Sequence, residues 1–557
     1  MPIDHVVVLC LENRSFDHLL GHLEHPDPAF EGLLRGGPHT NPGWDGAPPV
    51  EASPHAKRVL PFGPDHSHDA VMEQLAVTGH GAAARPTNQG FVTSYERKAR
   101  GQVPPAFGGL LAPLLRQWYA RPPDPRTTAE GRGPLVMLCQ PPEQVPVLSR
   151  LALEFAVFDH WFCSVPGETW PNRNFLHAAT SDGETNIEPR LYTDRTIFEV
   201  LEENGQTWRI YHDDTPQVWA FPALWDTPER HANWHPTGHF AREAAAGDLP
   251  AYSFIEPNHR PPFHTMDHSP AFGGVPDAGS SQHPENNLVS NAAYDDYDSP
   301  EETDFARSER LVATVYEGLR ANPEVFARTL LLITYDEHGG FFDHVPPPTG
   351  VPGPGDPQSL FARLLHAIWH RSATTFDFGM LGPRVPAVAV SPLIPAGTLV
   401  SRVHDHASVP ATLRALFAPH AEPLTARDAW ASPFHGVTTL EEPRTDLPDL
   451  SDHTAPPAPG PPPAARVAAP DGAAPPPAPP EHVPEYYWDF VRQSDQVRRR
   501  LATIGEPEIA PAATSSGVRR GQDITEAFAR AAHRHRHPDE EGAGSPSVAA
   551  ASTRPQV

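Results

Sequence analysis

Five short, almost uninterrupted apolar runs limit what this chain can fold into. They are residues 5–11, 208–211, 252–255, 329–335 and 385–390, and they are rich in Val, Ile, Leu and aromatic side chains. A strand with one solvent-facing side alternates apolar and polar residues, whereas these runs do not alternate. The pattern predicts strands of a parallel sheet that is covered on both faces.

Segments with helical periodicity lie between these runs, at residues 145–155, 196–204, 305–321 and 408–417. Parallel strands need long crossover connections, and a helix is the usual one. A chain that alternates strands and helices in this way folds as an α/β domain. The sequence therefore predicts a doubly wound, mostly parallel sheet with helices on both faces.

Proline, at 71 of 557 residues, divides the chain into parts of different character. Residues 1–450 carry the strand and helix patterns and are predicted to form one large domain. Residues 451–483 are dominated by Pro, Ala and Gly, which is typical of an extended linker without a core. Residues 484–557 are predicted to contain one short amphipathic helix, at about 485–501, followed by a largely disordered tail.

Two long stretches of the first domain, residues 26–64 and 258–300, show neither the helical nor the strand periodicity of apolar residues. Both are rich in Pro, Gly, Asp and His. Loops of this length inside a compact domain are usually lids or binding loops. We therefore expect both stretches to border a functional site.

Composition excludes several classes of partner and environment. The formal net charge of −27 argues against a nucleic-acid partner, which would require a basic face, and an anionic membrane would also repel the chain on average. Three widely spaced cysteines (Cys10, Cys139, Cys163) imply no disulfide framework. No apolar segment approaches the ~20 residues of a membrane span, and the N-terminus has no signal-peptide pattern. Because no signal-peptide pattern is found, a cytoplasmic location is expected, and export by a leaderless route is the alternative.

Acidic and amide residues follow two of the predicted strands directly. Glu12 and Asn13 come after residues 5–11, and Asp336 and Glu337 come after residues 329–335. Ligands of open α/β sheets bind at the carboxyl ends of strands, so both clusters point to one rim. Neighbouring carboxylates repel each other, and a divalent cation relieves the repulsion. The all-oxygen set favours Ca²⁺, Mg²⁺ or Mn²⁺ over zinc, while helix capping or self-solvation of a loop would also explain either pair alone.

A third polar cluster contains Thr169, which precedes Trp170, Pro171 and a helix-like run to about residue 180. The spacing predicts that Thr169 is the N-cap of a helix, with Pro171 in the first turn. A capping role alone would explain the residue. The same position also suits a nucleophile, because free N–H groups at a helix N-terminus bind phosphoryl oxygens and a nearby metal activates a hydroxyl.

Four motifs in these regions resemble the bacterial phosphoesterase family. They are ENRSFDH at 12–18, FDHWF at 158–162, PGETWPNR at 166–173 and TYDEHGG at 334–340. That family includes phosphatidylcholine-type phospholipases C and an acid phosphatase, and its fold is similar to the alkaline phosphatase core. The resemblance covers about residues 3–420, which would make residues 1–450 a catalytic domain. The family's export leader and β-rich C-terminal modules have no counterpart here, which puts a lipid bilayer substrate in doubt.

The resemblance implies roles for individual residues. It assigns one divalent metal ion to Glu12, Asn13, Asp336, Glu337 and the nucleophile, which is Thr169 as in the phospholipases C. Three further correspondences are weaker.

The first two are His66 and His283, at positions where family histidines contact phosphate or protonate the leaving group, and His283 is the better candidate for protonating the leaving oxygen. The third is Asn172, which aligns with an amide on the phosphate side. The implied function is hydrolysis of phosphodiesters with phosphatidylcholine-like head groups through a phosphothreonine, with phospholipid as a candidate substrate. A phosphomonoesterase and a non-catalytic binding protein with a decayed site are the alternatives. A sulfatase is disfavoured because the chain lacks the required C/S-x-P-x-R motif.

Overall fold

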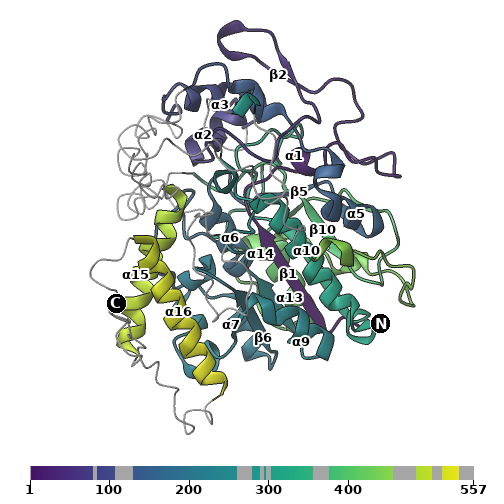
Figure 1. The fold of residues 1–557 in the computed structure, drawn as a ribbon, viewed down its shortest axis with the longest axis vertical. Helices are drawn as coiled ribbons and strands as arrows, with labels where there is room; N and C mark the ends of the chain where they lie inside the picture. The colour runs from purple at the N-terminus through teal and green to yellow at the C-terminus, as the bar shows by residue number, and fades with distance from the viewer. Residues whose placement is uncertain are drawn as a thin grey trace, which may run out of the picture.

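An eight-stranded mixed sheet forms the centre of the protein (Figure 1). The structure is a computed structural model that describes residues 2–79, 84–106, 129–259, 279–288, 294–296, 303–355, 376–455, 485–504 and 517–537. In spatial order the strands are β11 (Thr398–Val400), β4 (Ala156–Phe158), β10 (Ala387–Val390), β9 (Thr329–Tyr335), β1 (His5–Leu11), β8 (Tyr252–Ile255), β6 (Trp208–His212) and β7 (Trp234–Pro236). Among these described strands, β10 alone runs against its neighbours.

The central strands β9, β1 and β8 are buried on both faces. Every residue of β9 is buried, as is every residue of β1 after His5. Full burial explains why these runs are continuously apolar, because neither face is available to polar side chains. β1 pairs in parallel with β9 from His5 opposite Thr329 to Leu11 opposite Tyr335. The chain therefore leaves both strands at the same level of the sheet.

Helices cover the sheet in two groups (Figure 1). In the first, α10 (Asp304–Arg320) contacts both α5 (Pro146–Glu154) and α9 (Phe240–Ala246). In the second, α6 (Thr169–Ala178), α7 (Ile197–Glu203) and α13 (Ser408–Phe417) contact one another. Further α-helices among the described residues up to 455 are α1 (Phe16–Leu20), α2 (His68–Gln74), α3 (Phe91–Ala99), α8 (Pro228–His231), α11 (Pro323–Phe326) and α14 (Ala426–Trp430). The predicted α/β fold is confirmed.

Two-stranded ribbons occur outside the main sheet. β12 (His404–Asp405) pairs with β5 (Trp161–Phe162) in parallel. β2 (Thr40–Asn41) pairs with β3 (Val50–Glu51) in antiparallel fashion, inside the first of the two long loops. The three cysteines are buried free thiols. None of the described helices combines the length and the apolar character needed to cross a bilayer.

Two C-terminal helices, α15 (Glu485–Thr503) and α16 (Gly517–Arg536), pack against each other along one side of the molecule (Figure 1). The sequence predicts only the first of these helices, and the structure adds the second at residues 517–536. Ile524, Phe528 and Ala532 are buried at helical spacing, and this stripe packs into the main core. The linker residues 456–484 and the last 20 residues lie outside the described ranges.

Candidate active site

Acidic residues follow four adjacent strands of the sheet at their carboxyl ends. Asp336 follows β9, Glu12 follows β1, Glu256 follows β8, and Asp214 lies two residues after β6. All four side chains are buried. We call this edge of the sheet, with the residues that contact these four carboxylates, the rim. Removing carboxylates from water disfavours their charged forms, so the rim needs cations or hydrogen-bond donors to stabilise them.

Asn13 joins the two acidic clusters that the sequence singles out. Its backbone N–H donates to Asp336 Oδ1 at 3.0 Å, and its side-chain amide donates to Glu337 Oε1. Asn13 has a φ of 59°, in the left-handed region that asparagine tolerates better than most residues. Because the amide nitrogen is used by Glu337, the amide oxygen of Asn13 is directed elsewhere.

That oxygen accepts a hydrogen bond from Thr169 Oγ1 at 3.4 Å. Thr169 is the first residue of α6, and Glu168 occupies the N-cap position without a side-chain capping bond. The prediction that Thr169 caps the helix is therefore wrong by one residue. The hydroxyl instead points to the acidic clusters, at the N-terminal end of a buried helix.

The two glycines after His338 allow this close approach. Gly339 and Gly340 have φ values of 67° and 74°. A Cβ atom on Gly339 would lie 2.1 Å from the carbonyl oxygen of Asn13, and one on Gly340 would lie 2.6 Å from Pro64 Cβ. A side chain on Gly339 would push the chain off Asn13, and one on Gly340 would push it off Pro64, so the pair does more than form a turn.

Glu12 lies beside this group. His259 Nε2 lies 3.6 Å from its Oε1, and the side chain of Ser281 also stabilises its charged form. Burial raises the pKa of Glu12 to about 7, although His259 and Arg173 oppose the shift. The carboxylates of Glu12, Asp336 and Glu337 are not among the described groups in which three ligand atoms lie within 4.8 Å of one another. The structure therefore gathers Asn13, Asp336, Glu337 and Thr169, with Glu12 at the edge.

Arg173 is a central residue to which the sequence analysis gives no role. Its Nε donates to Asp336 Oδ2 at 3.0 Å, its Nη1 to Glu256 and its Nη2 to the carbonyl oxygen of Cys10 at 3.1 Å. The guanidinium is fully buried. It lies one helical turn after Thr169, so one face of α6 supplies both the hydroxyl and the cation that holds Asp336.

His259 links the rim to the C-terminal helix α15. Its Nδ1 is 3.3 Å from Asp214 Oδ1, and its backbone N–H donates to Asp214 Oδ2 at 2.9 Å. Burial alone would lower the pKa of His259, but Glu12 and Asp214 raise it to about 9. The ring of Phe490 stacks on His259 with centroids 4.7 Å apart, and Phe490 also contacts Trp170 at 5.6 Å.

The two histidines named from the sequence reach the same rim. His66 Nδ1 is 3.2 Å from Glu337 Oε1, and the rings of His66 and His283 lie 5.9 Å apart. His283 Nδ1 accepts from the backbone N–H of Glu285 at 3.2 Å, which places the proton of the neutral ring on Nε2. Burial lowers the pKa of His283 well below its usual range, and His66 and Arg14 lower it further.

Asn172 and His406 hold the backbone of the site. The Asn172 amide donates to carbonyl oxygens of the preceding loop, that of Val165 among them at 3.0 Å, and its Oδ1 accepts from Val165 N–H at 2.9 Å. A phosphate contact for Asn172 stays a prediction, since the loop already uses these atoms. His406 accepts from Trp161 and donates from Nε2 to the carbonyl oxygen of Asp336 at 2.5 Å.

A hard divalent cation fits the donors of this rim. Asp336 is neutralised by Arg173, whereas Glu12 and Glu337 have no guanidinium contact among the described residues. Burial raises the pKa of Glu337 well above its usual range, and the nearby Asp336 charge adds to the shift. Carboxylate, amide and hydroxyl oxygens are the ligands that Ca²⁺, Mg²⁺ and Mn²⁺ prefer.

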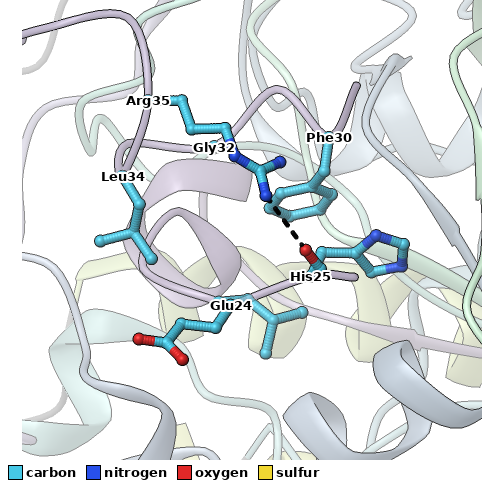
Figure 2. Close-up of a pocket in the computed structure, with 7 residues that line it drawn as sticks. Glu24, His25, Phe30, Gly32, Leu34 and Arg35 are labelled. Atoms are coloured by element: carbon cyan, nitrogen blue, oxygen red, sulfur yellow. Dashed lines mark hydrogen bonds between the residues drawn. The ribbon is translucent and has the colours of Figure 1, made fainter. Parts of the chain in front are cut away.

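A surface pocket of about 360 Å³ lies in the first long loop and is separate from this rim (Figure 2). It is lined by Leu23, Glu24, His25, Phe30, Gly32, Leu34 and Arg35. Arg35 Nη2 donates to the carbonyl oxygen of His25 at 3.3 Å and closes one side. None of the rim residues lines it, so it is not the candidate active site.

Sequence comparisons identify a family and several relatives of this chain. The profile of the Phosphoesterase family matches residues 3–418. Non-specific phospholipase C6 of Arabidopsis thaliana is 35% identical over 471 residues, which cover 82% of this chain and 76% of the relative. Phospholipase C A of Mycobacterium tuberculosis is 27% identical over 494 residues, covering 81% of this chain and 80% of the relative.

Solved structures give weaker matches. A protein in the alkaline phosphatase superfamily from Vibrio parahaemolyticus is 14% identical, with a TM-score of 0.29 over 52% of this chain and 64% of that chain. A phosphonate monoester hydrolase from Silicibacter pomeroyi is 12% identical, with a TM-score of 0.27 over 55% of this chain and 73% of that chain. The α/β fold of this chain is instead established by the strand order and helices described above.

Proposed function

The chain belongs to the phosphoesterase family and hydrolyses phosphoric esters, and we propose that its substrates are phosphodiesters of the phospholipase C type with phosphatidylcholine-like head groups. Thr169 is the nucleophile, and one divalent cation assists it. One observation carries the proposal, namely the hydrogen bond of Thr169 Oγ1 to Asn13, whose amide is itself held by Glu337.

The N-terminal end of α6 provides a place for the phosphoryl group. Glu168 at the N-cap makes no side-chain capping bond, so the first N–H groups of the helix are not capped by that side chain. Such N–H groups and the positive end of the helix dipole bind phosphate oxygens. Thr169 begins this helix, so its hydroxyl lies beside any phosphorus atom bound there.

Glu12, Asn13, Asp336, Glu337 and Thr169 would hold the cation. When bound, a divalent cation would neutralise the carboxylates, lower the pKa of the threonine hydroxyl and offset charge on the phosphoryl oxygens. Thr169 needs such help, because the Asn13 amide oxygen that accepts its hydrogen bond is not basic enough to take the proton. Ca²⁺, Mg²⁺ or Mn²⁺ suits these oxygen donors better than zinc.

Each residue of the rim has a separate role in the proposed reaction. Thr169 Oγ gives up its proton to solvent and attacks phosphorus, the bond from phosphorus to the alcohol oxygen breaks, and an imidazole delivers a proton to that oxygen. Of the two histidines, we assign this role to His66 in place of His283, because His66 Nδ1 lies 3.2 Å from Glu337 Oε1 at the centre of the rim while burial keeps His283 neutral. His283 can still donate Nε2–H to a phosphoryl oxygen. The phosphothreonine formed in this way still carries the head group, and water finally hydrolyses it, which releases the head-group phosphate and restores the Thr169 hydroxyl.

A substrate panel tests the proposed function. Purified full-length protein is assayed with p-nitrophenyl phosphorylcholine, p-nitrophenyl phosphate and phosphatidylcholine vesicles, after chelation and with Ca²⁺, Mg²⁺, Mn²⁺ or Zn²⁺ restored singly. We expect the choline diesters to give the higher kcat/KM, and activity to be lost on chelation and regained with a hard cation. A preference for p-nitrophenyl phosphate would instead make the protein a phosphomonoesterase, and full activity after chelation would remove the cation from the mechanism.

The assignment of His66 predicts a leaving-group effect. His66→Ala should reduce hydrolysis of a choline diester with an alkyl leaving group by about 10²–10⁴-fold, the usual contribution of a general acid. Hydrolysis of p-nitrophenyl phosphorylcholine should fall much less, because p-nitrophenolate leaves without a proton. The comparison is repeated with His283→Ala, which should slow both substrates alike. Equal losses on both substrates in His66→Ala would contradict the assignment.

A further inference from the structure

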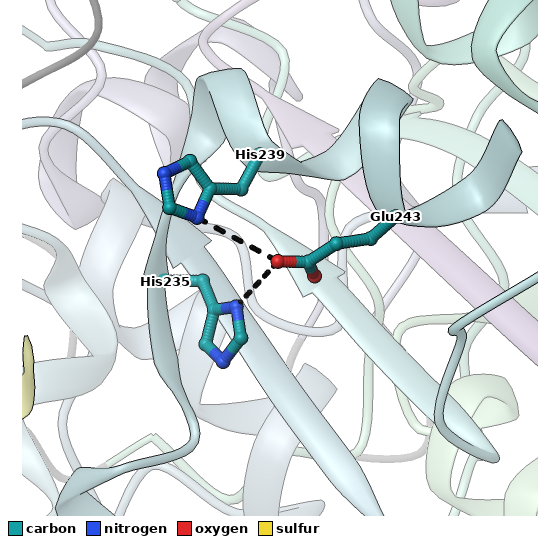
Figure 3. A group of neighbouring side chains, drawn as sticks. All are labelled: His235, His239 and Glu243. Carbon is teal, nitrogen blue, oxygen red and sulfur yellow. Dashed lines mark hydrogen bonds and ion pairs between the residues drawn. The ribbon is translucent and has the colours of Figure 1, made fainter. Parts of the chain in front are cut away.

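His235, His239 and Glu243 form a cluster at the edge of the sheet that the proposed reaction does not use (Figure 3). His235 lies in the edge strand β7, His239 immediately precedes α9, and Glu243 lies in the first turn of α9. Three inter-strand spacings separate β7 from β1, which is about 14 Å at ~4.8 Å per strand. The cluster is therefore separate from the candidate active site.

We propose that this cluster is a second metal site, of the zinc type. His235 Nδ1 is 2.9 Å from Glu243 Oε1, and His239 Nδ1 is 3.6 Å from the same oxygen. All three ligand atoms lie within 4.8 Å of one another. Ligand atoms of a tetrahedral zinc ion with bonds of ~2.0–2.1 Å lie about 3.3–3.4 Å apart, so small side-chain adjustments place all three around one ion. Two imidazoles and one carboxylate are ligands that zinc accepts.

The two oxygens of Glu243 have different partners. Oε2 accepts from Tyr211 Oη at 2.8 Å and from Arg209 Nη1 at 3.1 Å, whereas Oε1 faces the two imidazoles (Figure 3). Partners of this kind orient a metal-binding carboxylate. The Arg209 charge is also offset by Asp248, whose Oδ1 lies 2.8 Å from Nη2. Glu243 is thus held with one oxygen directed at the imidazoles.

The site is open on one side. The side chain of His239 is 32% exposed, against 10% for His235 and 11% for Glu243. An ion can therefore enter past His239, and water can complete the four-coordinate shell. The other cation near the cluster, Arg536 of α16, donates to the carbonyl oxygen of Trp234. A metal ion here would tie β7 to α9 close to the C-terminal helix.

Hydrogen bonds between the imidazoles and Glu243 are the alternative explanation, and zinc counting distinguishes the two. Full-length protein is dialysed against chelator-buffered Zn²⁺, and bound zinc is measured for the wild type, His239→Ala, Asp336→Asn and the control His420→Ala, which removes an exposed histidine elsewhere. We expect His239→Ala to lose one equivalent of zinc while keeping phosphodiesterase activity. The control should bind as much zinc as the wild type.

A second measurement guards against misfolding of the variant. Co²⁺ added to the wild type should give the visible absorption of a four-coordinate ion, and His239→Ala and His235→Ala should each lack it while keeping wild-type circular dichroism. Equal zinc content in His239→Ala and His420→Ala would overturn the proposal, leaving a hydrogen-bonded triad or an adventitious ion only. Asp336→Asn should lose activity and keep the zinc bound at the His235, His239 and Glu243 cluster. Activity therefore tests the proposed function, and zinc content tests the second site.

Discussion

Replacement of Thr169 by alanine is expected to lower kcat by on the order of 10⁴-fold or more, which is the scale seen when a hydrolase loses its nucleophile. The substitution removes one hydrogen bond, to Asn13, and that bond is long at 3.4 Å. Stability should therefore change by less than about 1 kcal/mol. Steady-state assays with p-nitrophenyl phosphorylcholine measure the first effect, and thermal unfolding measures the second.

Thr169→Ser is the matched control for this experiment. It keeps the hydroxyl at the start of α6 and removes only a methyl group, so it should retain much of the activity that Thr169→Ala loses. Acid quenching of the wild type during turnover of p-nitrophenyl phosphorylcholine should also leave a phosphocholine ester on the peptide that contains Thr169, detectable by mass spectrometry. Substantial turnover by Thr169→Ala, or a phosphocholine ester on a different residue, would contradict the proposed nucleophile.

Replacement of Arg173 by methionine is expected to reduce the free energy of unfolding by about 3–5 kcal/mol, the cost of leaving a buried charge without its partner. Arg173 serves two buried carboxylates, Asp336 and Glu256, and methionine can replace its volume but not its five donors. Denaturant unfolding at neutral pH measures the loss. Saturating divalent cation should restore part of it if an ion binds beside Asp336.

The exposed pair of Arg195 and Glu203 provides the control for Arg173. Both side chains are about half exposed, at 46% and 59%, so Arg195→Met should cost no more than about 1 kcal/mol. A similarly small loss in Arg173→Met would show that the buried carboxylates are already protonated, since neutral acids need no guanidinium. That result would also weaken the argument for a cation at the rim.

The sequence predicts the long elements of this fold well, because their burial determines their composition. β1, β8 and β9 occupy the predicted residues, since strands covered on both faces must be apolar throughout. Three strands of the main sheet were not predicted, namely β4, β7 and β11, and they have three residues each and show no period. α16 was missed for another reason, because exposed charged and polar residues such as Arg530 and His533 interrupt its buried stripe.

The rim could be predicted only in part. Glu12 and Asp336 follow long apolar runs, so strand position alone marks them. The same rule identifies Glu256, which directly follows the run 252–255, but the sequence analysis applied it to two strands only. Asp214 and Phe490 carry no local signal, because their contacts with His259 depend on how distant segments pack.

The stacking of Phe490 on His259 has a consequence for how far the working enzyme extends. The family match ends at residue 418, yet a ring more than 70 residues later borders the imidazole beside Glu12. A fragment cut at the end of the match would leave His259 and Trp170 without that neighbour, and it would uncover the tryptophans around Phe528. A change confined to the segment after the family match can therefore alter the surroundings of His259 while every rim residue stays the same.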